Sequence, residues 1–297
     1  MDKMGTMIRT ILEDGQASCI LIDGTEIVKE AQGIHGLSPV ATAALGRALM
    51  GAILMAADLK EMGGDITLSI AGDGPLGKIL VIADNEGNAR GRVDNPHLAL
   101  PLTAEGKLDV GGAVGRDGTL TVVRDVGFRE PYQGRVSLYT GEIAEDIAYY
   151  YATSQQQPCL WYLGVHLDRD GSVLSAGGLS ISPLPGCSEE ALRKIELGVP
   201  LYSDLANMLV DNTLAQCLPI VLHGLAYKVL EESPVAYRCN CTRERMERAL
   251  ISLGAAELES MIEEDKGAEL SCQFCNRTYQ FSEEDLTGLL AEATEKP

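Results

Sequence analysis

The sequence feature that most constrains this fold is a set of four cysteines near the C-terminus. They form a C-x-C pair, Cys239 and Cys241, and a C-x-x-C pair, Cys272 and Cys275, with thirty residues between the pairs. The segment that contains them, residues 235–297, is too short to build a comfortable hydrophobic core without a cross-link. We therefore expect the cysteines to supply that cross-link.

Zinc is the cross-link that this spacing favours. Tetrahedral Zn²⁺ binds thiolates at about 2.3 Å, and a tight turn lets one short stretch supply two of them. Two such pairs complete the shell and leave no open position for water or substrate, so the predicted site is not catalytic. The prediction is one Zn²⁺ per chain, held in the reduced form by Cys239, Cys241, Cys272 and Cys275. Paired disulfides and unligated thiols are the alternatives.

Such a site is compatible with three kinds of function. A nucleic-acid-binding ribbon is disfavoured, because residues 235–297 hold seven Lys and Arg against thirteen Asp and Glu. A thioredoxin-like pair is disfavoured, because "CQFC" precedes the strand-like "RTYQF" instead of opening a helix that would lower a thiol pKa. The third function is a redox switch, in which oxidation of the thiolates to disulfides expels the zinc and removes the cross-link.

Composition describes a globular, acidic protein. The chain has 297 residues, of which 45% are hydrophobic, and a formal charge of -19, which disfavours nucleic-acid and membrane-surface partners. The start, "MDKMGTMIRTILEDG", lacks a secretory signal pattern, so we expect a cytoplasmic protein, where permanent disulfides are rare. The other four cysteines are expected to be small buried hydrophobes: Cys19, Cys159, Cys187 and Cys217.

Residues 1–182 are predicted to form an α+β core domain of largely antiparallel strands with packed helices. Short strand-like runs such as "DITLSIA", "GKILVIA" and "GTLTVVRDV" follow one another across glycine-rich turns. Hairpins are predicted around Asp23-Gly24 and around "RDG" at residues 169–171. A helix is predicted over "EIAEDIAYYYATS".

One apolar segment, residues 40–59, is almost long enough to cross a bilayer. It carries Arg47 midway and Asp58 near its end, and Ser38 and Pro39 supply an N-cap and a first-turn proline. These features favour a buried core helix over a membrane span.

The remaining chain is predicted to contain a helical linker arm, residues 183–234, and a small zinc-binding domain, residues 235–297. Helical periodicity in the arm is broken by glycine and proline, so the arm needs a neighbouring surface to bury its leucines and valines. In the terminal domain we expect helices over residues 242–253 and 255–265. A last helix is expected to begin at the capping-box-like Ser282-Glu-Glu-Asp285.

The sequence contains no convincing catalytic motif, and we expect no enzyme. "GDGPLGK" resembles a phosphate-binding loop, but Ile79 replaces the required Ser or Thr, and a strand-like run follows instead of a helix. The carboxylates Glu142, Glu145 and Asp146 are expected to complement a helix dipole. The histidines lie outside metal-ligand spacing: His35, His97, His166 and His223.

The arrangement "CNCTRERMERAL…SCQFCNRTYQF" resembles the redox-regulated 33 kDa chaperonin family of heat-shock proteins. The resemblance extends over nearly the whole chain through "GDGPLG", "REPYQGRVSLYTGEIAEDIAYYYATSQQ", "LGVHLDRDG" and "AGGLSISPLPG". The combination is specific, whereas either cysteine pair alone is not.

This resemblance implies an ATP-independent holdase that is inactive while reduced and zinc-bound. It also implies that oxidation forms the disulfides Cys239–Cys241 and Cys272–Cys275, releases zinc, and unfolds the arm to expose apolar surface. The implied partners are unfolding client proteins, and neither nucleic acid nor membrane is expected as a partner. Whether the chain forms a homodimer, especially when oxidised, is left open. The alternative is a zinc-ribbon adaptor that binds nucleic acid or protein.

Overall fold

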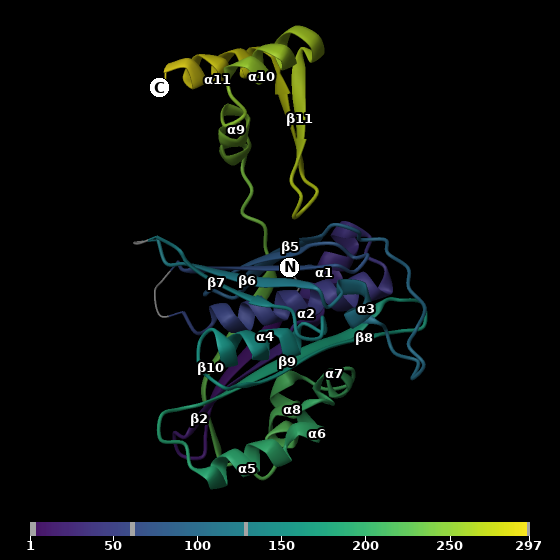
Figure 1. The fold of residues 1–297 in the computed structure, drawn as a ribbon, viewed down its shortest axis with the longest axis vertical. Coiled ribbons are helices and arrows are strands. Elements are labelled where there is room, and N and C mark those ends of the chain that lie inside the picture. Colours follow the sequence, from purple (N-terminus) through teal and green to yellow (C-terminus); the bar gives the residue numbers. More distant parts are fainter. Residues whose placement is uncertain (1–3, 60–62, 128–129, 296–297) are drawn as a thin grey trace. The chain divides into compact units, whose positions relative to one another are not determined.

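The computed structural model describes residues 4–59, 63–127 and 130–295. The chain divides into two compact units, residues 1–238 and 239–297, each with its own sheet and helices (Figure 1). Both units mix helices with largely antiparallel strands, so the predicted α+β class is confirmed.

The first unit contains a long sheet and most of the helices. Its strands are β1 (Gly5–Leu12), β2 (Ala17–Asp23), β3 (Asp65–Gly72), β4 (Ile79–Asp84), β5 (Asn88–Val93), β6 (Gly118–Asp125), β7 (Tyr132–Ser137), β8 (Leu160–Leu167), β9 (Val173–Pro183) and β10 (Tyr227–Tyr237). Its helices are α1 (Thr25–His35), α2 (Pro39–Ala56), α3 (Val110–Val114), α4 (Ala144–Thr153), α5 (Glu189–Leu197), α6 (Val199–Tyr202), α7 (Leu205–Met208) and α8 (Leu214–Val221).

The second unit is a two-stranded sheet with three helices among its described residues. Its elements are α9 (Arg243–Ile251), α10 (Ala255–Ser260), the π-helical turn η1 (Met261–Asp265), β11 (Gly267–Ser271), β12 (Thr278–Ser282) and α11 (Glu283–Glu295). The predicted capping box at the start of α11 is confirmed. The Ser282 amide donates to Asp285 Oδ2 at 2.8 Å, and the Asp285 amide donates to Ser282 Oγ at 3.2 Å.

The sheet of the first unit has the strand order β7-β6-β3-β4-β5-β10-β1-β2-β9-β8. Every neighbouring pair is antiparallel except β10 and β5, which are parallel and pair only through Ala236 and Tyr237 in the described ladder. The predicted hairpin around "RDG" is confirmed as β8 and β9. The long sheet is therefore two antiparallel halves that meet at one end of β10.

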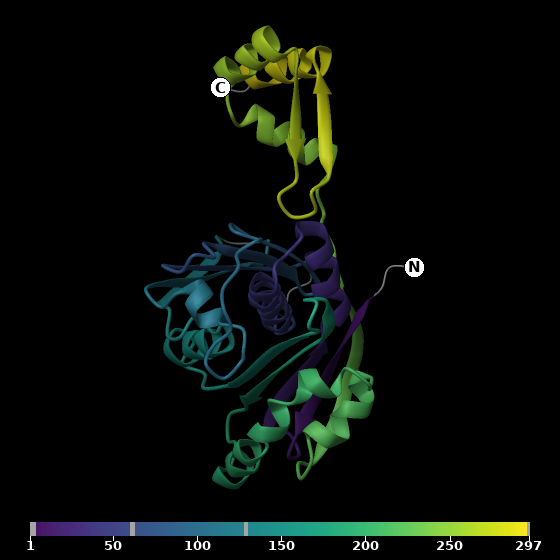
Figure 2. The ribbon, with the colours of Figure 1, turned by 90° about the vertical axis from the view of Figure 1, so that its right-hand side faces the viewer.

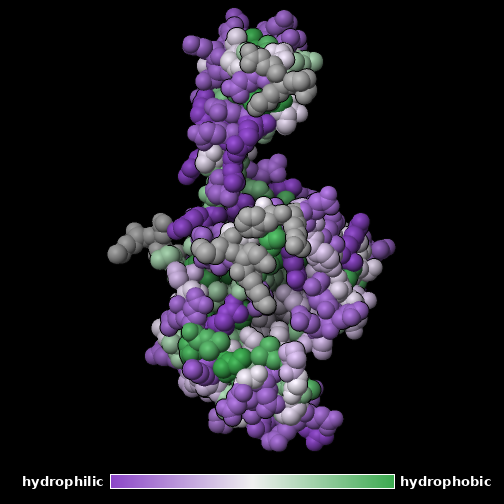
Figure 3. Space-filling model, turned by 90° about the vertical axis from the view of Figure 1, so that its left-hand side faces the viewer, coloured by the Kyte–Doolittle hydropathy of each residue, from purple (hydrophilic) through white to green (hydrophobic). Residues whose placement is uncertain are grey.

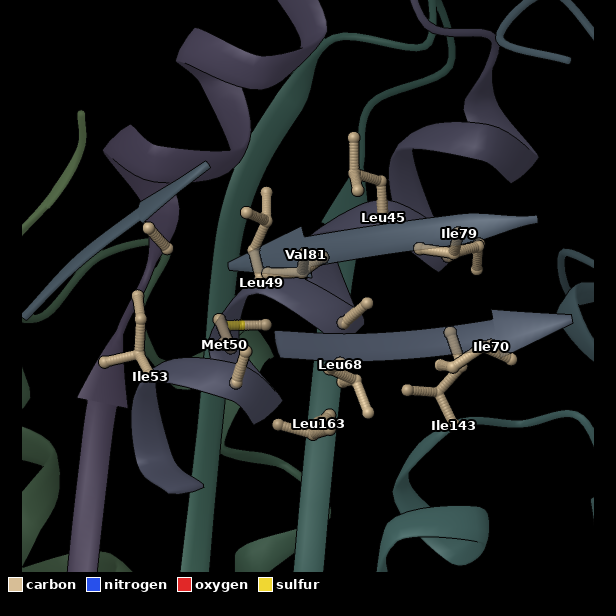
Figure 4. Close-up of a cluster of buried hydrophobic side chains, with 14 of the residues drawn as sticks. Leu45, Leu49, Met50, Ile53, Leu68, Ile70, Ile79, Val81, Ile143 and Leu163 are labelled. Carbon is tan, nitrogen blue, oxygen red and sulfur yellow. The ribbon is translucent and has the colours of Figure 1, made fainter. Parts of the chain in front are cut away.

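Helix α2 forms the centre of the larger core. In Figure 2 it lies between the strands of the two sheet halves, and 89% of its residues are buried. Pro39 is its first residue and Ser38 Oγ accepts from the Ala41 amide, as the sequence predicts. Its side chains interdigitate with both halves and with the region of α4: Figure 4 shows Leu45, Leu49, Met50, Ile53, Leu68, Ile70, Ile79, Val81, Ile143 and Leu163. The segment is a core helix rather than a membrane span.

The predicted hairpin at Asp23-Gly24 is wrong. Strand β2 ends at Asp23, whose Oδ1 accepts from both the amide and the hydroxyl of Thr25, and this turns the chain into α1. The hairpin at this end of the chain joins β1 to β2 through the turn at residues 13–16, where Asp14 and Gly15 adopt positive φ. The turn between β1 and β2 therefore contains Asp14-Gly15, where no hairpin was predicted, and Asp23-Gly24 leads into a helix instead.

The predicted arm, residues 183–234, is helical only as far as Val221 in the structure. Residues 227–237 form β10, which pairs antiparallel with β1, so the expectation of helix there is wrong. Helices α5 to α8 bury a second core against β1, β2, β8 and β9, which provides the neighbouring surface that the arm was expected to need. This second core contains Ile8, Leu12, Leu21, Leu179, Ile195, Leu205, Leu214, Leu218 and Val221.

The three carboxylates around α4 have separate tasks. Asp146 is fully buried and accepts hydrogen bonds from the amides of Tyr139, Thr140 and Gly141 through Oδ1, and from that of Ile143 through Oδ2. Glu142 forms an ion pair with Arg47 of α2, and Glu145 is exposed. Asp146 therefore holds the turn before α4 in place through its hydrogen bonds, whereas the sequence analysis predicted only a favourable interaction with the helix dipole.

We predict that Asp146→Asn lowers the free energy of unfolding of the first unit by on the order of 3 kcal/mol. An amide nitrogen cannot accept the hydrogen bonds that the carboxylate accepts, and the charge that strengthens them is lost. Urea unfolding followed by the fluorescence of Trp161, the single tryptophan, measures this change. The control Glu145→Gln should change stability by less than about 0.5 kcal/mol, and equal effects of the two substitutions would contradict the assignment.

Candidate metal centre

The four C-terminal cysteines lie on two neighbouring pieces of the second unit. Cys239 and Cys241 precede α9, which begins directly after them because Thr242 Oγ1 accepts from the Arg245 amide. Cys272 and Cys275 lie in the turn that joins β11 to β12. In that turn the Cys272 amide donates to the Arg277 carbonyl at 2.9 Å. The antiparallel pairing of β11 with β12 therefore shapes the C-x-x-C turn.

The four sulfur atoms lie within 4.8 Å of one another. The Sγ atoms of Cys239 and Cys272 are 3.6 Å apart, and those of Cys241 and Cys275 are 3.4 Å apart. A regular tetrahedron with metal–sulfur bonds of about 2.3 Å has sulfur–sulfur edges of about 3.8 Å. The arrangement fits one four-coordinate ion, and all four positions would be filled by protein ligands.

The environment of the sulfurs favours a negative charge on one of them. Burial alone would raise the pKa of Cys241, but hydrogen bonds from the Tyr279 hydroxyl, at 3.2 Å, and from the neighbouring thiols lower it to about 7. Burial raises the pKa of Cys239 and of Cys275. Four sulfurs this close cannot all be thiolates unless a cation balances them.

The hydrophobic core of the second unit is small. Its fully or nearly fully buried members are Leu250, Leu258, Phe281, Leu286 and Leu289. Arg243 adds polar connections between elements: it lies over the ring of Phe281, 4.4 Å from the centroid, and pairs with Asp285 at 3.0 Å. So few buried side chains leave the unit in need of a further cross-link.

Two residues near the sulfur cluster were not predicted from the sequence. Tyr279 donates its hydroxyl to Cys241 Sγ and to the Cys241 carbonyl, at 3.2 Å and 3.1 Å. Arg243 reaches the Gln280 carbonyl at 2.9 Å. Neither belongs to a ligand motif, and only the register of β12 against β11 brings Tyr279 to the site.

The other four cysteines lie apart from this cluster. Cys19 and Cys217 are fully buried, as predicted. Cys159 is partly buried and packs against the larger core, and Cys187 is only partly buried, so the prediction is wrong for Cys187. Cys159 Sγ accepts from Trp161 Nε1 at 2.9 Å, and burial raises its pKa to about 12. Among the described residues, the terminal four are the one group with metal-binding geometry.

Comparisons with known proteins give a consistent result. A family model described as "Hsp33 protein" matches residues 5–282. Relatives named 33 kDa chaperonin include one from Acetivibrio thermocellus, 45% identical with 96% of each chain covered. Another, from Shouchella clausii, is 42% identical with 98% of each chain covered.

A solved structure shares the fold as well as the sequence. The crystal structure of a 33 kDa chaperonin from Thermotoga maritima is 35% identical and matches with a TM-score of 0.88, covering 98% of this chain and 99% of that one. The family match extends over the core, the helices α5 to α8 and all four clustered cysteines. The chain therefore belongs to the Hsp33 family of chaperones.

Proposed function

We propose that this chain is an ATP-independent holdase whose activity is switched on by oxidation of its four C-terminal cysteines. The observation that carries the proposal is the cluster of four thiols, within 4.8 Å of one another, in a unit with a small core. Membership of a chaperone family supports binding of unfolding client proteins in the cytoplasm, rather than catalysis.

In the reduced state, Cys239, Cys241, Cys272 and Cys275 would hold one Zn²⁺. The donor chemistry supports zinc, because four thiolates in a tetrahedron form a structural zinc site. Zinc would neutralise the thiolates and cross-link the segment before α9 to the turn between β11 and β12. Tyr279 would orient the Cys241 sulfur through its hydroxyl.

Oxidation by a peroxide would proceed in two balanced steps at each cysteine pair. A thiolate attacks the peroxide, the O–O bond breaks, and the sulfur becomes a sulfenic acid while one oxygen leaves as hydroxide. The second thiol of the pair then displaces water, so that an S–S bond forms and two electrons per pair have passed to the peroxide. Disulfide sulfurs are no longer thiolate ligands, so the metal would be released.

The pairing of the disulfides decides whether oxidation loosens the unit. The nearest sulfur pairs, Cys239 with Cys272 and Cys241 with Cys275, belong to different motifs. Disulfides between those residues would preserve the cross-link and close long loops, which stabilises a small unit. Disulfides within each motif would enclose only one or two residues and remove the connection. We propose the pairing that the resemblance to the redox-regulated family implies, Cys239–Cys241 and Cys272–Cys275, because this pairing would remove the connection.

Strand β10 would carry the effect to the helical arm. Cys239 directly follows Arg238, whose amide donates to the Ala89 carbonyl at 2.8 Å, and β10 leads back along the chain to α8. Unfolding of the second unit would weaken this end of β10. Release of α5 to α8 would expose the leucines of the second core to unfolding clients.

The alternative is a zinc-dependent adaptor. The charge of residues 235–297, with seven basic against thirteen acidic side chains, opposes nucleic acid as its partner. Measurable DNA or RNA binding at physiological salt would favour the adaptor over the holdase.

We predict that the reduced protein binds about one zinc per chain and that Cys272→Ser abolishes this binding, because a serine hydroxyl is not a thiolate. Metal analysis after dialysis measures the zinc content. Amide exchange should also accelerate around Leu250 and Phe281 in this variant. Cys187→Ser, which alters a thiol of the first unit, is the control. An unchanged zinc content in Cys272→Ser would exclude the proposed ligand set.

We predict that peroxide produces disulfides within the motifs. Trypsin cleaves after Arg238, Arg243, Lys266 and Arg277, so each motif lies on a peptide of its own, residues 239–243 or 267–277. Each peptide should be lighter by two hydrogen atoms in the mass spectrum, without cross-linked products. Cross-linked peptides that join the two motifs would contradict the proposed pairing.

We predict that the oxidised protein suppresses aggregation of a thermally unfolding client and that the reduced protein does not. Light scattering of the client measures this effect. Amide exchange of residues 205–225 should rise on oxidation, because the arm loses support. Zinc release without a gain in suppression would show that the cluster is structural and not a switch.

A further inference from the structure

The turn between β1 and β2, residues 13–16, holds the start of the helical arm. The Leu184 amide donates to the Gln16 carbonyl and the Ser188 amide donates to Gln16 Oε1, both at 2.8 Å. Ser188 is the N-cap of α5, so Gln16 fixes the point at which the arm enters its first helix. Figure 2 shows this turn at the end of the sheet, beside the arm helices.

Glu13 of the same turn joins α5 to the residue that precedes β10. Glu13 Oε2 accepts from Lys194 Nζ at 2.9 Å, and Glu13 Oε1 accepts from the Ala226 amide at 2.8 Å. The Glu13 amide donates in return to the Ala226 carbonyl at 2.8 Å. One carboxylate therefore connects the first helix of the arm with the chain that leaves the arm helices and enters β10.

The Glu13 carboxylate depends on both partners because it is buried. The residue is 8% exposed, and the hydrogen bonds from Lys194 and from the Ala226 amide keep the pKa of its carboxyl below the usual value. A buried charge that loses one of its partners is costly. The two contacts therefore stabilise the closed arm together, and we expect them to break together.

The backbone of the turn is also held by these contacts. Glu13 and Asp14 adopt φ values of 48° and 55°, in the left-handed region that residues with side chains rarely occupy. Such a conformation persists where the surrounding structure fixes it, as the contacts of Glu13 with Ala226 and Lys194 do here. Loss of these contacts would remove part of what keeps the turn in this shape.

The Glu13 contacts lie where β10 begins. Leu12, the residue before Glu13, pairs with Tyr227, the residue after Ala226, at one end of the ladder between β1 and β10. The other end of β10 lies two residues before Cys239. A separation of β10 from β1 that starts near the cysteines would therefore reach Glu13 last and would then pull the Ala226 amide away from the carboxylate.

We propose that the Glu13 carboxylate couples the separation of β10 to the release of the arm helices, because it holds Lys194 of α5 and the Ala226 amide at the same time. This inference rests on the proposed switch and names the contact through which it would act. Removal of the carboxylate should then open α5 to α8 without oxidation. Figure 3 shows that one face of the closed first unit is mostly hydrophilic, with apolar surface in a few patches, and opening would add the leucines of the second core.

The test is amide exchange of the reduced, zinc-bound, full-length protein that carries Glu13→Gln. The new side chain keeps an oxygen for the Ala226 amide but loses the charge that holds Lys194, so exchange in α5 to α8 should accelerate on the order of tenfold. Exchange in α2 and the zinc content should not change, because neither depends on this contact. Unchanged exchange in α5 to α8, or an equal acceleration in α2, would overturn the proposal.

Two further variants use the neighbours of Lys194. Glu190→Gln is the matched control: Glu190 lies 3.5 Å from Lys194 but is 82% exposed, so exchange should stay within about twofold of the unmodified protein. Lys194→Met should accelerate exchange at least as much as Glu13→Gln. The double variant should exchange no faster than Lys194→Met alone, because Glu13→Gln then removes a buried carboxylate that has lost its cation. Additive acceleration, or an equal effect of Glu190→Gln, would contradict the coupling.

Client aggregation separates this inference from the proposed function. Reduced Glu13→Gln should suppress aggregation in part, and it should need less peroxide than the unmodified protein to suppress it fully. If α5 to α8 open in this variant but neither it nor the oxidised unmodified protein suppresses aggregation, the coupling stands and the holdase is wrong. If the oxidised unmodified protein suppresses aggregation and the variant needs as much peroxide, the coupling is wrong and the holdase stands.

Discussion

The second unit gathers four cysteine sulfurs beside a small hydrophobic core, and a connection between its two cysteine pairs would stabilise it. Its five best-buried side chains form too small a core to hold α9, the β11–β12 hairpin and α11 together with a wide margin. The four sulfurs lie where one ion would join the start of the unit to the tip of its hairpin. An ion bound there would carry much of the unit's stability, so its binding and release would control whether the unit folds.

Parts of this organisation follow from local sequence. The cysteine spacing predicted the cluster, and the Ser38-Pro39 and Ser282–Asp285 signals predicted where α2 and α11 begin, because caps are formed by residues a few positions apart. One local sequence signal also gave a wrong prediction. The Asp-Gly pair at residues 23–24 has the signature of a hairpin turn, yet the Asp23 carboxylate starts a helix by accepting from Thr25.

Other parts depend on contacts between residues far apart in the chain. The segment around Val229 and Leu230 has an ambiguous apolar pattern, and it becomes a strand because β1 offers an edge to pair with. Tyr279 reaches the sulfur cluster only through the register of β12. The intrinsic preferences of residues within one short segment do not contain that information, so neither strand β10 nor the contact of Tyr279 with Cys241 could be predicted.

The position of β10 has a consequence for synthesis. Strand β1 is made before the other strands of the first unit, but its partner on one side, β10, is almost the last part of that unit to be made. Until then the nascent chain holds an unpaired β1 edge, and the arm helices lack a finished sheet to pack against. Long-range pairing of this kind slows folding and prolongs exposure of apolar strands. During its own synthesis, a protein proposed to protect others from aggregation therefore passes through an incompletely folded state with exposed apolar strands, which is the kind of state that such a chaperone would bind.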